Sequence, residues 1–252
     1  MRKPLIVGNW KMHGTLEETL KLITELRHKL PAATVADVAV APPFTCLYTA
    51  HVALQETAIL LAAQNMHWET DGAFTGEISG AFLKDAGCSL VLLGHSERRQ
   101  HFGETDEGVN RKALTALTLE LTPVVCIGET WEQRKSGKTE SVIETQIKKG
   151  LQGIPMTELA NVVVAYEPVW AIGTGQTAKT DDVESALHFI RNFIAKAYDA
   201  PASNAIRLLY GGSVTPETAP ELAQSGNLDG FLVGGASLSI DKFLKIIAAK
   251  GN

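Results

Sequence analysis

The chain has 252 residues, of which 45% are hydrophobic and 20% charged, so it is long enough to bury one large core. Its formal net charge of −5 argues against binding to nucleic acid or to an anionic membrane, which usually requires a basic face. Three widely separated cysteines, Cys46, Cys88 and Cys126, form neither a disulfide framework nor a CxxC zinc pattern. No apolar run is long enough to cross a bilayer, and we expect a cytoplasmic protein.

Short apolar runs recur along the whole chain. Each run is continuous rather than alternating, which is typical of parallel strands that are covered on both faces. The runs predict eight strands, at residues 5–7, 38–41, 59–63, 90–93, 124–127, 162–165, 206–210 and 231–233.

Helical patterns lie between these runs. Residues 15–18 (Thr-Leu-Glu-Glu) form a capping-box signature ahead of apolar residues at helical spacing. Thr180 opens a second pattern, and the apolar face of that helix carries Val183, Leu187, Ile190 and Ile194. The pair Thr215–Pro216 predicts the start of a third helix, with proline at the first helical position.

Strand and helix alternate about eight times, at roughly 30 residues per unit, which is the size of a βα unit. No linker or low-complexity segment interrupts the series, so we expect one domain over residues 1–252. A (β/α)8 barrel with eight parallel strands and an outer ring of helices fits best. A doubly wound open sheet has the same alternation, but the first strand is not followed by a glycine-rich fingerprint.

In a barrel of this kind the chemistry gathers at the C-terminal ends of the strands. Asn9 and Lys11 follow the first predicted strand, His95 follows the fourth, and Glu167 follows the sixth. A lone histidine is more often structural and a lone lysine more often solvated, but here both occupy strand ends that also supply an acid. The other polar or thiol residues at strand ends are Gln64, Asn65, Cys126 and Glu129.

Two glycine pairs follow the last two predicted strands, Gly211-Gly212-Ser213 and Gly234-Gly235. Either pair alone reads most simply as a tight turn. On adjacent strands, next to helix starts and beside the Ser213 hydroxyl, they predict a phosphate site made of backbone N–H groups.

Other motifs point away from alternative chemistries. Residues 136–139 (Ser-Gly-Lys-Thr) resemble the end of a P-loop, but Glu132 stands where that motif needs glycine. Residues 173–175 (Gly-Thr-Gly) are too short for a dinucleotide fingerprint, so we expect no nicotinamide or flavin cofactor. Cys126 has apolar neighbours and no nearby base, which disfavours a nucleophilic role. Arg98 and Glu104 are expected to form a structural ion pair.

Five motifs in order give the chain a resemblance to the triosephosphate isomerase family over essentially its whole length. They are residues 8–11 (GNWK), 94–99 (GHSERR), 165–175 (AYEPVWAIGTG), 210–214 (YGGSV) and 233–236 (VGGA). The resemblance implies a TIM barrel that interconverts dihydroxyacetone phosphate and glyceraldehyde 3-phosphate without a metal or cofactor.

By that resemblance Glu167 is the base that removes a proton beside the carbonyl, and His95 is the neutral imidazole that serves the enediolate oxygens. Lys11 resembles the fixed cation, with Asn9 as a further donor. The resemblance places the phosphate on Asn9, Lys11, Gly173, Ser213, Gly234 and Gly235.

The resemblance also implies a lid and a subunit interface. The lid consists of Pro168, Val169, Trp170, Ala171, Ile172, Gly173, Thr174, Gly175, Gln176, Thr177 and Ala178. Many family members carry lysine at the position of Gln176, which we expect to alter hinge kinetics at most modestly. The segment 65–78 resembles the family's interface loop, from which Thr75 would enter the other subunit of a homodimer.

Two other function classes stay open at this point. An aldolase-like barrel would use Lys11 as a Schiff base, and borohydride trapping would detect it. A non-catalytic barrel would keep the glycine pairs as a sugar-phosphate site, but it would have no reason to retain Glu167 and His95.

Overall fold

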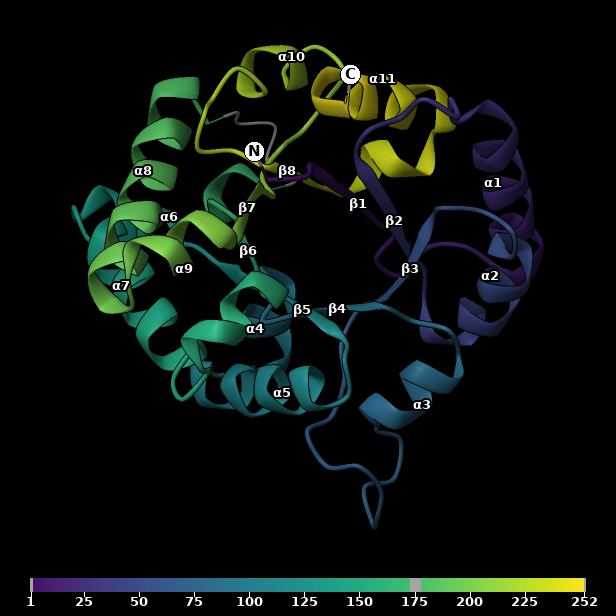
Figure 1. Cartoon of the computed structure of the whole chain (residues 1–252), viewed down its shortest axis with the longest axis horizontal. Helices are drawn as coiled ribbons and strands as arrows, with labels where there is room; N and C mark the ends of the chain where they lie inside the picture. Colours follow the sequence, from purple (N-terminus) through teal and green to yellow (C-terminus); the bar gives the residue numbers. More distant parts are fainter. Residues whose placement is uncertain (1, 173–177, 252) are drawn as a thin grey trace.

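The computed structural model describes residues 2–172 and 178–251 and shows a closed barrel of parallel strands (Figure 1). Neighbouring strands pair in sequence order, and the last pairs with the first. This closure confirms the barrel and excludes the open sheet. The strands are β1 (Leu5–Asn9), β2 (Asp37–Ala41), β3 (Leu60–Ala63), β4 (Leu90–Leu93), β5 (Thr122–Ile127), β6 (Val163–Tyr166), β7 (Arg207–Tyr210) and β8 (Gly230–Val233).

Helices form a ring around the barrel (Figure 1). None of the helices in the described part of the chain is both long and apolar enough to cross a membrane. The α-helices are α1 (Leu16–Lys29), α2 (Leu47–Leu54), α3 (Gly80–Asp85), α4 (Ser96–Phe102), α5 (Asp106–Thr118), α6 (Trp131–Lys135), α7 (Thr139–Gly150), α8 (Thr180–Ala197), α9 (Ala200–Ala205), α10 (Ala219–Leu222) and α11 (Ile240–Gly251). Short 3-10 turns are η1 (Phe44–Cys46), η2 (Met156–Asn161), η3 (Val169–Ala171) and η4 (Gly235–Leu238).

The continuous apolar runs are explained by two hydrophobic layers. Alternate strand residues such as Leu5, Val7 and Leu209 pack together in a cluster that contains only strand residues. This cluster is the interior of the barrel. The intervening residues, such as Ile6 and Leu208, pack against the helices in the outer layer. Because both faces of each strand are covered, no position in the strand interiors has to be polar.

Two of the three helix predictions are confirmed in detail, and the third is wrong at its start. The Thr15 hydroxyl and the Glu18 side chain complete a capping box at α1. Helix α8 begins at Thr180 and buries its predicted apolar face. Helix α10, by contrast, begins at Ala219 rather than at Pro216. Thr215 accepts the N–H groups of Thr218 and Ala219 as it would at a helix start, but Pro220 has no N–H to donate to the Pro216 carbonyl, so this turn does not continue as a regular helix.

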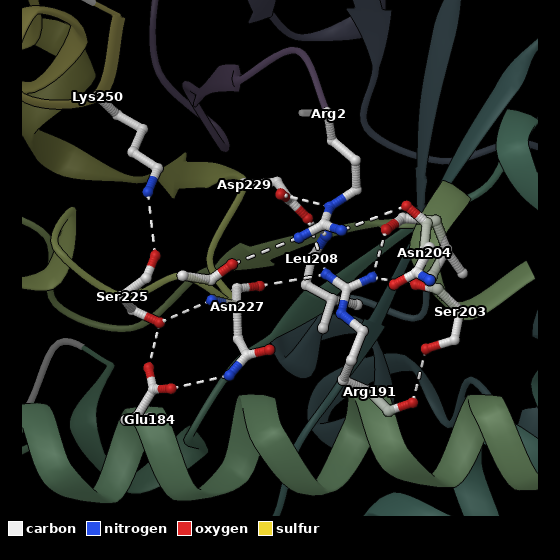
Figure 2. A network of polar contacts seen from close by, with 12 residues as sticks. Arg2, Glu184, Arg191, Ser203, Asn204, Leu208, Ser225, Asn227, Asp229 and Lys250 are labelled. Carbon is white, nitrogen blue, oxygen red and sulfur yellow. Dashed lines mark hydrogen bonds and ion pairs between the residues drawn. The ribbon is translucent and has the colours of Figure 1, made fainter. Parts of the chain in front are cut away.

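A polar network lies at the N-terminal ends of β7 and β8, whereas the predicted site lies at the C-terminal ends of the strands; Figure 2 shows the residues of the network. Asp229 accepts from Arg191 at 2.9 Å, from Arg2 at 2.6 Å and from the backbone N–H of Leu208 at 2.8 Å. Arg191 also donates to the carbonyl groups of Ser203, Ile206 and Asn227. The network ties β7, β8 and α8 to the N-terminus, so this face of the barrel serves stability.

Candidate functional site

A cavity of about 540 Å³ opens at the C-terminal ends of the strands. Its lining includes strand-end residues that follow β1, β4, β6, β7 and β8, whereas the strand-end candidates Gln64, Asn65, Cys126 and Glu129 do not line it. The structure brings together Asn9, Lys11, His95, Glu167, Gly211, Gly212, Ser213, Gly234 and Gly235. Five of these residues contribute charge, imidazole, amide or hydroxyl side chains to a space large enough for a small metabolite.

The Glu167 carboxylate is buried and only partly bound. Its Oε2 accepts the backbone N–H of Ser96 at 2.9 Å, whereas Oε1 has no hydrogen-bond partner among the described residues. The side chain is only 2% exposed, so an unpartnered carboxylate oxygen is costly there and is available to a ligand. Glycine at position 211 leaves room for the Glu167 side chain, because a Cβ at that position would lie 2.8 Å from the Glu167 Cγ.

His95 reaches Glu167 from across the barrel, with its Nε2 at 3.3 Å from Oε1. The residue caps the N-terminus of α4, where its Nδ1 accepts the backbone N–H of Glu97 at 3.3 Å. Since an accepting Nδ1 carries no proton, the neutral ring holds its proton on Nε2, which faces the cavity. The helix cap therefore fixes both the direction and the tautomer of the imidazole.

Lys11 is held in a strained backbone conformation. Its φ of 53° is unusual for a residue other than glycine and costs roughly 1–3 kcal/mol. The surroundings stabilise it, because its N–H donates to Asn9 Oδ1 at 3.0 Å and its carbonyl accepts from Gln64 at 2.8 Å. Strain maintained in this way is typical of a functional position.

The Lys11 ammonium lies 2.6 Å from the Glu97 carboxylate. Partial burial raises the pKa of Glu97, but the hydrogen bond and charge of Lys11 outweigh it and hold that pKa below its ordinary value. Glu97 therefore stays ionised and holds the Lys11 side chain in one direction. Sequence reasoning missed this role, and the only available signal was the position of Glu97 within the 94–99 motif.

Glu129 is a second buried carboxylate that sequence reasoning noted without a role. It accepts the Tyr166 hydroxyl at 3.1 Å and the Trp170 indole N–H at 2.9 Å. Arg134 lies over the Trp170 ring at 4.6 Å and approaches Glu129 at 3.7 Å. Trp131 packs against Trp170 with ring centroids 5.8 Å apart. This arrangement anchors the first part of the predicted lid beside the cavity.

The predicted phosphate end of the cavity is only partly described. Ser213, Gly234 and Gly235 line it, and a Cβ at Gly234 would lie 3.5 Å from the Lys11 side chain. Ile172 and Leu232 line the same cavity. Ala178 is buried. The remaining predicted lid residues, Gly173, Thr174, Gly175, Gln176 and Thr177, lie outside the described residues.

Several other sequence candidates lie outside the chemistry. Burial, and secondarily the charge of Glu167, raises the pKa of the Cys126 thiol, which leaves it unreactive. The segment 136–139 joins α6 to α7 and does not line the cavity. Arg98 and Glu104 form the predicted ion pair at 3.0 Å. In the described ranges no group of three or more His, Cys, Asp or Glu residues is placed to hold a metal ion.

Comparisons with known proteins agree on one family. A family model described as triosephosphate isomerase matches residues 4–250. The chain is 51% identical to the triosephosphate isomerase of Geotalea uraniireducens over 98% of both chains. It is 50% identical to that of a Thermoanaerobacter species and 47% identical to that of Dictyoglomus turgidum, in each case over 98% of this chain and 99% of the relative.

Proposed function

Because the chain belongs to the triosephosphate isomerase family, we propose that the residues gathered at the C-terminal ends of its strands carry out the reaction of that family. The chain is an isomerase of glycolysis and gluconeogenesis that interconverts dihydroxyacetone phosphate and D-glyceraldehyde 3-phosphate. The reaction moves one proton between two adjacent carbons of the substrate.

Glu167 is the base of this proposal. Its carboxylate takes the proton from the carbon beside the substrate carbonyl, and the electron pair of that C–H bond moves to form an enediolate. The same carboxyl group then returns the proton to the neighbouring carbon, which gives the other isomer. The unpartnered Oε1, 3.3 Å from the His95 ring, is the observation that carries this assignment.

His95, Lys11 and Asn9 stabilise the negative charge that develops on the substrate oxygens. The His95 Nε2–H donates to these oxygens, and a neutral imidazole can also take such a proton back without trapping the intermediate. The Lys11 ammonium and the Asn9 amide add fixed donors near the cavity floor. Glu97 acts through Lys11, so it is a positioning residue.

We assign the phosphate of the substrate to the part of the cavity that the glycine pairs after β7 and β8 line. Ser213, Gly234 and Gly235 line this part, and glycine leaves backbone N–H groups open to an anion. No side chain projects at Gly235, where even a Cβ would have open space around it. Gly173 belongs to the same proposal from the sequence resemblance.

Residues 168–178 are proposed to act as the lid of this cavity. Ile172 and Leu232 place apolar surface at the cavity wall, where it can exclude water from the reacting atoms. Trp170 is held by Glu129 next to the cavity rather than inside it. Breaking that bond is therefore one cost of any movement of the lid over the substrate.

Conversion in D2O tests the reaction type. The protein should convert glyceraldehyde 3-phosphate into dihydroxyacetone phosphate that carries deuterium at the carbon that received the proton. An aldolase-like role would instead give a borohydride-trapped adduct on Lys11. The Lys11–Glu97 contact argues against that role, because Glu97 occupies the Lys11 nitrogen that would have to attack a carbonyl.

We further propose a homodimer that forms through the 65–78 loop, in which Thr75 is exposed. The connection between β3 and α3 extends away from the barrel (Figure 1). Exposed apolar side chains follow each of the first four strands: Met12, Phe44, Phe74 and Phe102. Adjacent strands place them on one side of the molecule, where a second copy would cover them. Light scattering at micromolar concentration should give twice the chain mass of 27.1 kDa, and a monomer would contradict the proposal.

A cytoplasmic location completes the proposal. It is supported by the glycolytic reaction and by three free, buried cysteines, which suit a reducing compartment. Fractionation of the source cells would test it.

A further inference from the structure

The charges that line the cavity cancel one another. Of the described lining residues, Glu167 and Glu217 carry one negative charge each, and Lys11 and Lys242 carry one positive charge each. A phosphate monoester brings a charge of about −1.5 to −2 at neutral pH. The Lys11 charge is already balanced in part by Glu97 at 2.6 Å. Attraction of the substrate therefore depends on a cation other than Lys11.

Lys242 occupies a position that helix electrostatics disfavour. It is the third residue of α11, and the first turn of a helix attracts acidic rather than basic side chains. Its neighbour Asp241 follows that rule and binds Lys29 at 2.9 Å. Lys242 is exposed, lines the cavity and forms no ion pair with the described residues. A lysine that helix electrostatics disfavour but that lines an anion site is explained by a role in binding the anion.

Glu217 is the opposing charge at the same wall. It is exposed, and it also lines the cavity. The hydrogen bond with Thr215 is the main cause that lowers the pKa of Glu217, and the charges of Lys242 and Lys245 lower it further. Glu217 is therefore ionised at neutral pH and lies within electrostatic reach of both lysines. Lys245 does not line the cavity, which makes it a matched control.

We propose that Lys242 is a specificity-determining residue that draws the dianionic phosphate end of the substrate into the cavity, with Glu217 opposing it. This inference rests on the proposed phosphate site. The charge acts through space on a group that does not react, so it strengthens substrate binding and leaves the proton transfer itself alone. Its effect is selective for phosphorylated over uncharged substrates.

The test compares the wild type with Lys242→Met, Lys245→Met and Glu217→Gln. Inhibition by inorganic phosphate and the conversion of glyceraldehyde 3-phosphate and of unphosphorylated glyceraldehyde are measured at low and high ionic strength. Methionine keeps the length of the lysine side chain and removes its charge. Far-ultraviolet circular dichroism establishes that each variant is folded.

At about 10 mM ionic strength, Lys242→Met should raise the inhibition constant of phosphate and the KM of the phosphorylated substrate about two- to five-fold. The kcat should stay close to that of the wild type, and the ratio of kcat/KM for the phosphorylated over the unphosphorylated substrate should fall. Glu217→Gln should shift both constants in the opposite direction, and Lys245→Met should shift them less. At about 0.5 M salt these differences should nearly vanish.

If Lys242→Met and Lys245→Met shift the inhibition constant of phosphate and the KM equally, the inference is overturned, because the effect is then that of net charge and not of position. If Lys242→Met lowers kcat/KM equally for the phosphorylated and the unphosphorylated substrate, the inference is also overturned. If phosphate does not compete with substrate in the wild type, the phosphate site fails and this inference fails with it. Failure of the phosphate site can be told apart from failure of the inference alone, because in the latter case phosphate still competes with substrate in the wild type.

Discussion

Replacing Asp229 with alanine removes the carboxylate that joins two guanidinium groups beneath the barrel (Figure 2). Asp229 is 6% exposed, and Arg191, which donates to it at 2.9 Å, is 8% exposed. Burial, and secondarily the charge of Arg2, lowers the pKa of Arg191, while Asp229 opposes both effects. In the variant the two arginines repel each other and the Leu208 N–H loses its acceptor.

Breaking a buried pair of this kind costs about 3–5 kcal/mol, because it leaves an uncompensated charge in the interior. Asp37→Ala is the matched control. Asp37 also binds two cations, Lys3 at 2.6 Å and Arg207 at 3.0 Å, but its side chain is 25% exposed. Water can replace its partners, so the expected cost is about 0–1 kcal/mol.

Thermal and urea unfolding at one fixed protein concentration measure the two costs. At about 2–4 °C per kcal/mol for a chain of this size, Asp229→Ala should lower the Tm by about 10 °C and Asp37→Ala by less than about 4 °C. Both variants should keep their kcat below the transition, because the network lies at the opposite end of the strands. Equal Tm shifts in the two variants would refute the reasoning from burial.

Three further changes probe the site. Gly211→Ala should lower kcat about 10- to 100-fold at unchanged fold by circular dichroism, because the new Cβ would lie 2.8 Å from the Glu167 Cγ. Trp170→Phe removes the N–H that Glu129 accepts, so phosphate-bearing inhibitors that require lid movement should bind up to about tenfold more tightly by calorimetry. Glu97→Gln should destabilise by less than about 1 kcal/mol at pH 7, since the side chain is 40% exposed. Because the folded pKa of Glu97 lies below 4.5, its contribution is present above that pH and should disappear from urea midpoints as the pH falls through the folded value.

The sequence predicts the barrel well because its strand signal is local. Eight apolar runs, of which only the one at residues 206–210 includes a charged residue (Arg207), can be read without tertiary information, and each corresponds to an observed strand. The start of α10 is mispredicted because Pro220 has no backbone N–H for the Pro216 carbonyl, so the turn that opens at Thr215 is interrupted before the helix begins. Residue order shows both prolines, but proline is also common in the first turn of a helix, so the sequence alone does not separate the two outcomes.

The candidate site is predictable only as far as strand ends locate side chains. Asn9, His95 and Glu167 meet because barrel closure brings the C-terminal ends of their strands together. The roles of Glu97 and Glu129 depend on which side chain each one reaches, and those partners lie 86 and 41 residues away in the chain. Contacts of this kind follow from packing and not from spacing.

The most direct test of the account is the rate of Glu167→Gln. Glutamine has nearly the same shape as glutamate but cannot take up the proton, so the account predicts a loss of about 10²–10⁴-fold in kcat for glyceraldehyde 3-phosphate. Competitive inhibition by inorganic phosphate should persist, which would show that the cavity is intact. A variant that isomerises the substrate at the wild-type rate would contradict the assignment of Glu167 as the base.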